Sequence, residues 1–97
     1  MGRVRLEGYL EVPPERIAQV VAALPAHIAL TRAEPGCLAF EVSQSATTPG
    51  HFLVAETFVD QAAFDLHQAR TRASAWAEVT AGLNRHYTVT VADGPDH

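Results

Sequence analysis

The spacing of apolar and polar residues in the first third of the chain predicts a strand followed by a helix. From residue 3 to residue 12, apolar side chains alternate with polar ones, as in a strand buried on one face. Pro13 and Pro14 end this strand because proline has no N–H group to donate to a β-ladder. Helical spacing follows, so we expect a helix from about residue 14 to residue 33, kinked but not ended at Pro25.

The rest of the chain predicts a pair of strands, a second helix and a final strand. The expected ranges are a strand at 37–45, a strand at 51–59, a helix at 61–82 that breaks near 69–71, and a strand at 85–92. Asp60 is a favourable residue to cap the second helix. The order β-α-β-β-α-β is typical of the α+β ferredoxin-like fold, in which helices cover one face of a four-stranded antiparallel sheet.

The face of this sheet opposite the helices is also expected to carry apolar side chains. They are Cys37, Ala39, Leu53, Ala55 and Val59. An apolar face of this kind is rarely left in water. A symmetric homodimer is the simplest way to cover it.

Length and charge restrict the class of protein further. The 97 residues predict a single domain over 1–97, with a frayed polar tail from about residue 93. The net charge is −4, and seven scattered arginines with no lysine argue against nucleic acid as a partner and exclude lysine chemistry. We see neither a membrane-spanning run nor a signal peptide, so we expect a cytoplasmic protein with no membrane partner.

A buried carboxylate and a histidine are the main candidates for chemistry. Glu56 shares a strand face with phenylalanine and valine, and therefore needs a partner or a raised pKa. His67 lies on the apolar side of the following helix, and the short connection lets the two side chains meet. His67 could then act as a general base that Glu56 orients. Alternatively, the two groups only satisfy each other, or Glu56 bonds to the backbone.

Four aromatic residues are candidates to line a substrate pocket around this pair, although for each one taken separately ordinary core packing is the better interpretation. They are Phe40, Phe58, Phe64 and Trp76. Trp76 is the strongest candidate because a buried indole N–H needs a hydrogen-bond partner. The other histidines form no HxH or HxxxH pair and Cys37 is the only cysteine, so we expect no metal site.

Three segments resemble the antibiotic biosynthesis monooxygenase family. They are Glu34–Val42 (EPGCLAFEV), Phe52–Phe58 (FLVAETF) and Asp60–His67 (DQAAFDLH), in the order and spacing of the family. The resemblance covers about residues 3–91. It implies a dimeric α+β barrel and places Glu56 and His67 at family positions. It also implies relatives that oxidise a polyphenol or quinol with oxygen and use no flavin, metal or other cofactor.

The chain departs from some of these relatives. Haem-degrading members carry an asparagine on the first strand and a histidine late in the second helix, where this chain has Glu7-Gly8-Tyr9 and Ala75-Trp76-Ala77. Haem degradation is therefore disfavoured. The hypotheses left are an oxygenase acting on a small aromatic or quinol-like substrate, a non-catalytic dimeric module that binds a small apolar ligand, and an isomerase or signal-processing enzyme using the same Glu–His pocket.

Overall fold

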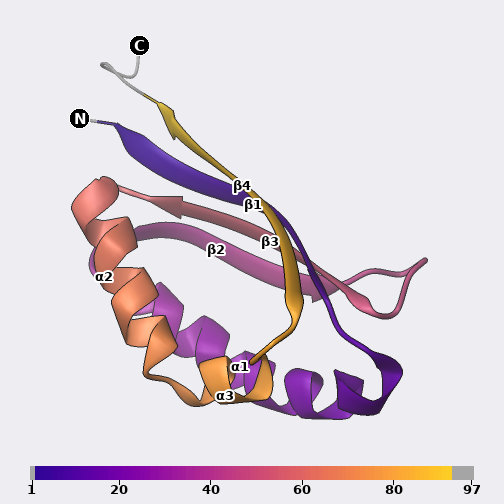
Figure 1. The fold of residues 1–97 in the computed structure, drawn as a ribbon. Coiled ribbons are helices and arrows are strands. Elements are labelled where there is room, and N and C mark those ends of the chain that lie inside the picture. The colour runs from indigo at the N-terminus through magenta and orange to yellow at the C-terminus, as the bar shows by residue number, and fades with distance from the viewer. Residues whose placement is uncertain (1, 93–97) are drawn as a thin grey trace.

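The computed structural model describes residues 2–92 as one α+β domain (Figure 1). The predicted tail from residue 93 lies outside these residues. Along the chain the elements are β1 (Arg3–Glu11), a 3₁₀ turn η1 (Pro14–Arg16), α1 (Ile17–Arg32), β2 (Cys37–Gln44), β3 (His51–Phe58), α2 (Gln61–Arg72), α3 (Ala75–Val79) and β4 (Asn84–Ala92). The predicted β-α-β-β-α-β order is confirmed.

The four strands form one antiparallel sheet in the order β2-β3-β1-β4. The long connection through α1 lets β1 lie between β3 and β4, whereas β2 and β3 form a hairpin. The start of β1 and the end of β4 lie side by side at one end of the sheet (Figure 1). This topology brings the start of α2 next to the turn between α1 and β2, which is where the candidate site lies.

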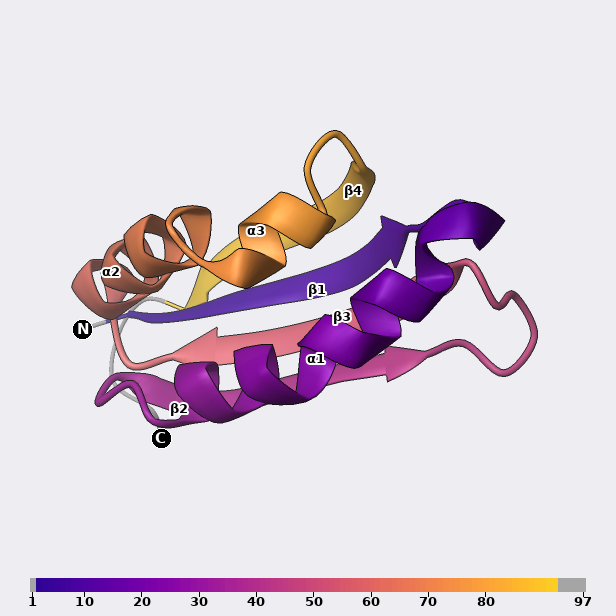
Figure 2. The ribbon, with the colours of Figure 1, turned by 90° about the horizontal axis from the view of Figure 1, so that it is seen from below.

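All helices lie on one face of the sheet (Figure 2). In that view α1 runs along β2 and β3, while α2 and α3 follow each other beside β1. Helix α1 continues through Pro25 without ending, as predicted. Helix α2 begins where expected because the Asp60 side chain accepts a hydrogen bond from the backbone N–H of Ala63 at 2.8 Å.

Between the helices and the sheet lie two clusters of buried residues. One contains Val4, Leu6, Val54, Phe58 and Phe64, and the other contains Leu10, Val12, Val20 and Phe52. The inward residues of β1 and β3 supply most of these side chains, as their period-two pattern predicted. The polar candidates Glu56 and His67 are also buried between the layers.

Two sequence predictions were wrong in detail. The second helix breaks at residues 73–74, not near 69–71, because Ser74 is extended and its hydroxyl donates to the carbonyl of Thr71 at 2.6 Å. The register of β2 also shifts between Cys37 and Ala39. This shift turns Cys37 towards the core and leaves Leu38 half exposed, so Cys37 does not belong to the open face.

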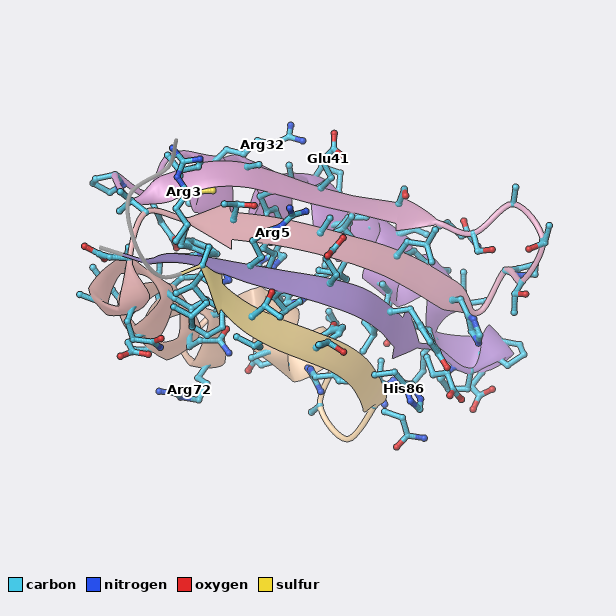
Figure 3. All side chains as sticks on the ribbon, turned by 90° about the horizontal axis from the view of Figure 1, so that it is seen from above. Arg3, Arg5, Arg32, Glu41, Arg72 and His86 are labelled. Atoms are coloured by element: carbon cyan, nitrogen blue, oxygen red, sulfur yellow. The ribbon has the colours of Figure 1, made fainter. Side chains whose placement is uncertain are left out.

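Figure 3 looks onto the open face of the sheet, which no helix covers. Arg5 lies near the middle of this view and His86 lies towards one edge. Leu53 is 47% exposed here, Ala55 follows it on the same face of β3, and Ala39 of β2 lies opposite Thr57. Val59, also predicted on this face, follows the end of β3 and lies instead beside Gly36 and Ala63 on the helix side. The open face therefore combines three of the predicted apolar residues, Leu53, Ala55 and Ala39, with charged groups of β1.

Candidate functional site

His67 is a deeply buried histidine on the sheet-facing side of α2. Only 2% of its surface is exposed. Its ring centroid lies 4.8 Å from that of Phe58 and 5.9 Å from that of Phe40, so aromatic rings from β3 and β2 flank it. Because Asp60 starts α2 directly after β3, His67 comes two helical turns later and faces the end of the same strand.

The hydrogen-bond partner of His67 is Glu34, from the turn between α1 and β2. His67 Nδ1 lies 2.9 Å from Glu34 Oε1. The other oxygen of Glu34 accepts a hydrogen bond from Nε of Arg70, and Nη2 of Arg70 donates to the buried hydroxyl of Thr31 at 3.1 Å. Glu34 is thus held from two sides, which fixes the orientation of the His67 ring.

Glu56 lies on the other side of the same ring. Its Oε1 atom is 3.7 Å from His67 Nε2 and has no hydrogen-bond partner among residues 2–92. Glu56 is only 8% exposed, and it is paired with Phe40 across the β2–β3 ladder. Burial, reinforced by the negative charge of Glu34, raises the pKa of Glu56 from 4.5 to about 7.

These surroundings determine the proton positions on His67. Burial lowers the pKa of His67 below 6.5, and although Glu34 raises it in part, Arg70 lowers it further. The ring is therefore neutral at neutral pH. Because a carboxylate can only accept hydrogen bonds, we assign the single ring proton to Nδ1, facing Glu34. The lone pair then lies on Nε2, 3.7 Å from Glu56 and 3.5 Å from the hydroxyl of Thr71.

The structure brings most of the predicted aromatic residues together around this histidine. Phe58 and Phe40 flank His67, and Phe64 packs against Phe58 with ring centroids 5.7 Å apart. Trp76 is separate from this group. It stacks face to face on His27, with centroids 4.6 Å apart and 3° between the planes. His27 in turn lies 6.3 Å from His67.

A groove reaches the surface beside His67. Its volume is about 630 Å³, within the range of small-molecule sites. It is lined by Glu34, Pro35, Gly36, Val59, Asp60, Ala62, Ala63, Leu66, His67 and Arg70. Glu34 and Arg70 are among these residues, and Glu56 is not. The walls are mainly apolar, and the polar residues Glu34 and Arg70 lie at the histidine.

Gly36 allows the close approach of the two chain segments that form the groove. A Cβ atom at this position would lie 2.3 Å from Cβ of Ala63 on α2. The turn between α1 and β2 can therefore pack against the first turn of α2 only with glycine here. This contact brings Glu34 within reach of His67.

Sequence reasoning missed Glu34, Arg70 and His27 as members of the site. The signal for Glu34 was present, because it begins the segment Glu34–Val42 that carries the family resemblance. Arg70 follows His67 by three residues and lies on the same helix face. His27 had no distinguishing pattern, because a histidine on an apolar helix face is usually part of the core.

Residues 2–92 provide neither a metal-binding cluster nor a membrane-spanning helix. No group of three or more His, Cys, Asp or Glu side chains among residues 2–92 could hold a metal ion. None of the helices in this range is both long enough and apolar enough to span a bilayer.

The fold and the site together define an α+β ferredoxin-like domain with a buried histidine between two carboxylates. The family model described as antibiotic biosynthesis monooxygenase matches residues 3–79. The chain therefore belongs to the antibiotic biosynthesis monooxygenase family. Family membership supports a monooxygenase-like function.

Solved structures are similar over nearly the whole chain. One described as an antibiotic biosynthesis monooxygenase is 29% identical with a TM-score of 0.75, covering 99% of this chain and 100% of its own. Rv0793 from Mycobacterium tuberculosis is 28% identical with a TM-score of 0.69, and the coverages are 98% and 97%. SO0527 from Shewanella oneidensis is 26% identical with a TM-score of 0.72, and the coverages are 93% and 88%. No curated protein matches the chain.

Proposed function

We propose that this protein is a monooxygenase that oxidises a small phenolic or quinol-like metabolite without a cofactor, and that His67 is its general base. The observation that carries the proposal is the pair of carboxylates on either side of the His67 ring. Glu34 holds Nδ1 at 2.9 Å, and Nε2 faces Glu56 at 3.7 Å. Family membership supports the oxygenase chemistry.

The reaction balances with oxygen as the only co-substrate. A quinol and one O₂ give a hydroxyquinone and one water. His67 removes a hydroxyl proton, and the electron-rich ring carbon of the anion forms a bond to O₂. Loss of water from the resulting peroxide breaks the O–O bond and leaves the new carbonyl. One oxygen atom enters the product, and the substrate supplies all the electrons that reduce O₂.

Each residue has a separate role in this scheme. Glu34 fixes the tautomer, so that the Nε2 lone pair is the proton acceptor. Glu56, with its pKa near 7, exchanges that proton at neutral pH. Val59, Ala63 and Leu66 provide apolar walls of the groove that favour an aromatic ring. Phe40 and Phe58 pack against the His67 ring from within the core, and Phe64 packs against Phe58. The groove beside His67 admits the substrate.

The test is oxygen consumption on a panel of quinols and phenols, followed by mass spectrometry of the products formed under ¹⁸O₂. The proposal predicts one O₂ consumed per substrate and one ¹⁸O atom in each product. Turnover without oxygen consumption would instead identify an isomerase that uses the same pair of residues, Glu56 and His67. Binding of the compounds without any turnover would identify a non-catalytic binding module.

A further inference from the structure

A second, smaller cleft lies between α2, α3 and β4. Its volume is about 280 Å³, just below the usual range of small-molecule sites, so it suits a small ion. It is lined by Gln68, Thr71, Arg72, Ala77 and Arg85. None of these residues is acidic, and all except Ala77 carry a side-chain hydrogen-bond donor. The cleft therefore has two guanidinium groups on its walls and no carboxylate.

Arg85 is held at this cleft by uncharged groups. It is paired with the buried Leu10 across the β1–β4 ladder, so its side chain starts on the helix side of the sheet. Its Nη2 atom donates to the hydroxyl of Thr80 at 2.9 Å, and Nη1 donates to the carbonyl of Leu83 at 3.2 Å. Among residues 2–92 it forms no ion pair, and its Nε–H has no acceptor. The charge and the Nε–H group are therefore available to a ligand.

Arg72, the last residue of α2, supplies the second charge. Its side chain is exposed and forms neither a hydrogen bond nor an ion pair with the described part of the chain. Figure 3 shows it extending outward from the helix, so it can turn towards a ligand without breaking a contact. One unpaired arginine on a surface is ordinary. Two that line the same acid-free cleft favour an anion as the ligand.

We propose that this cleft binds a small oxyanion, a carboxylate or a phosphate, between Arg72 and Arg85, and that the bound charge acts on His67 across Thr71. Guanidinium groups bind both kinds of anion through paired N–H donors. Gln68 and Thr71 add further donors from α2. The cleft shares no lining residue with the groove beside His67, and the proposal does not depend on the oxygenase reaction.

Thr71 connects the cleft to His67. Its hydroxyl lies 3.5 Å from His67 Nε2, which is long for a hydrogen bond, so it can turn and donate to a ligand instead. An anion oxygen that accepts this hydrogen bond would lie within about 6 Å of Nε2. A negative charge at that distance favours the protonated imidazole and should raise the pKa of His67. The titratable and charged groups already around this ring are Glu34, Glu56, Arg70 and His27.

Nuclear magnetic resonance titration with acetate and acetamide tests the site. The two probes have nearly the same size and shape, but only acetate is charged, and sodium chloride keeps the ionic strength constant. We expect acetate to bind about tenfold more tightly than acetamide, because each of two exposed charge pairs contributes about threefold to fivefold. Acetate should also shift the Nε–H resonance of Arg85 and raise the pKa of His67. Inorganic phosphate is titrated in parallel, and the tighter of the two anions identifies the class of oxyanion.

Two variants show where the anion binds. Arg72→Gln removes one charge and should weaken anion binding about threefold to fivefold. Arg32→Gln removes the same charge at the opposite edge of the molecule in Figure 3 and should leave binding unchanged. Neither anion binding more tightly than acetamide, or unchanged anion affinity in a folded Arg72→Gln variant, would overturn the site. Anion binding that leaves the His67 titration unchanged would overturn the effect on His67.

Discussion

Two carboxylates give His67 opposite surroundings on its two ring nitrogens. Glu34 is anchored by Arg70 and accepts the Nδ1 hydrogen bond, whereas Glu56 is buried without a hydrogen-bond partner among residues 2–92. A carboxylate fixed by a cation is a stable acceptor, and a carboxylate in an apolar enclosure takes up a proton more readily. This asymmetry separates the orienting group from the group that exchanges protons.

Replacing Glu34 with glutamine should lower the pKa of His67. Glu34 raises this pKa through its charge and its hydrogen bond, so removing the charge leaves the effects of burial and Arg70. The measurement is a titration of the His67 ring resonances between pH 4 and pH 8 by nuclear magnetic resonance. Glu78→Gln, an exposed residue on α3, is the matched control and should leave the His67 titration unchanged. An unchanged or raised His67 pKa in Glu34→Gln would contradict the assignment.

Replacing Glu56 with glutamine should change how stability depends on pH. The pKa of Glu56 is raised from 4.5 to about 7 in the folded protein, so the folded state holds its proton more strongly than the unfolded chain. The stability due to this group is complete below pH 4.5 and is lost as the pH rises through 7. Relative to wild type, Glu56→Gln should therefore gain about 2–3 kcal/mol between pH 4 and pH 8.

Urea unfolding at both pH values measures this gain. The pKa of His27 is lowered to about 4, so His27 makes stability rise with pH. His27 is present in both proteins, and its effect cancels when the stability of wild type is subtracted from that of Glu56→Gln. Glu15→Gln, which changes an exposed carboxylate at the start of the helical segment, is the control and should show no such gain. An equal pH dependence for wild type and Glu56→Gln would mean that Glu56 is not a buried acid.

At the residue scale, the sequence could predict that Glu56 and His67 come together, but not which carboxylate bonds to the histidine. Periodicity placed Glu56 inward on its strand and His67 inward on the next helix. The contact between Glu34 and His67 spans 33 positions and depends on the packing of Gly36 against Ala63. The periodicity of one segment contains no information about such a contact between distant segments.

At the scale of elements, the spacing of hydrophobic residues predicted the strands and helices but not their local irregularities. The break in the second helix depends on the Ser74 hydroxyl, which bonds to the Thr71 carbonyl. The register shift in β2 reversed the side on which Cys37 lies. Both features depend on hydrogen bonds between specific atoms. The spacing of hydrophobic residues, every 2 in a strand and every 3.6 in a helix, does not predict them.

Gly8 should not tolerate a larger residue. It lies in the middle of β1 with φ of +151°, and a Cβ atom there would come within 1.9 Å of the carbonyl oxygen of His86 on β4. We expect Gly8→Ala to lower the free energy of unfolding by about 3 kcal/mol, because it adds a backbone clash to an unfavourable φ.

Gly82→Ala is the matched control for the clash at Gly8. Gly82 also has a positive φ, of +77°, but no atom lies within 4 Å of its Cβ position. This variant should lose only about 1 kcal/mol, the cost of the backbone conformation alone. Urea unfolding compares the two variants. A loss for Gly8→Ala no larger than that for Gly82→Ala would contradict the close packing of β1 against β4.

At the scale of the whole molecule, the open face of the sheet should form a homodimer. Leu53 and Ala55 of β3 and Ala39 of β2 share the open face, where Ala39 lies opposite Thr57 and Leu53 lies opposite Ser43. No helix covers this face of the sheet (Figure 3). Arg5 and Glu7 follow each other along β1 on the same face. A twofold axis that brings Arg5 of one copy to Glu7 of the other would also cover these apolar side chains. Such dimers often bury about 2,000 Å² or more.

Light scattering at micromolar concentration tests whether the protein is a dimer and whether the open face of the sheet forms the interface. The wild-type protein should have the mass of two chains, and Leu53→Glu should have the mass of one. Leu66→Glu is the matched control, because Leu66 is 69% exposed but lies on α2, away from the open face. A monomeric wild-type protein, or a dimer lost only in Leu66→Glu, would contradict the predicted interface.

The central claim is that His67 is the base of an oxygenase, and the rate of oxygen uptake by His67→Ala tests it most directly. The substrate is the best quinol from the panel, and circular dichroism confirms that each variant is folded. Loss of a positioned base should slow the reaction by about 10²–10⁴-fold. His86→Ala, a change on the far side of the sheet, should keep the wild-type rate. Full activity in a folded His67→Ala variant would contradict the account.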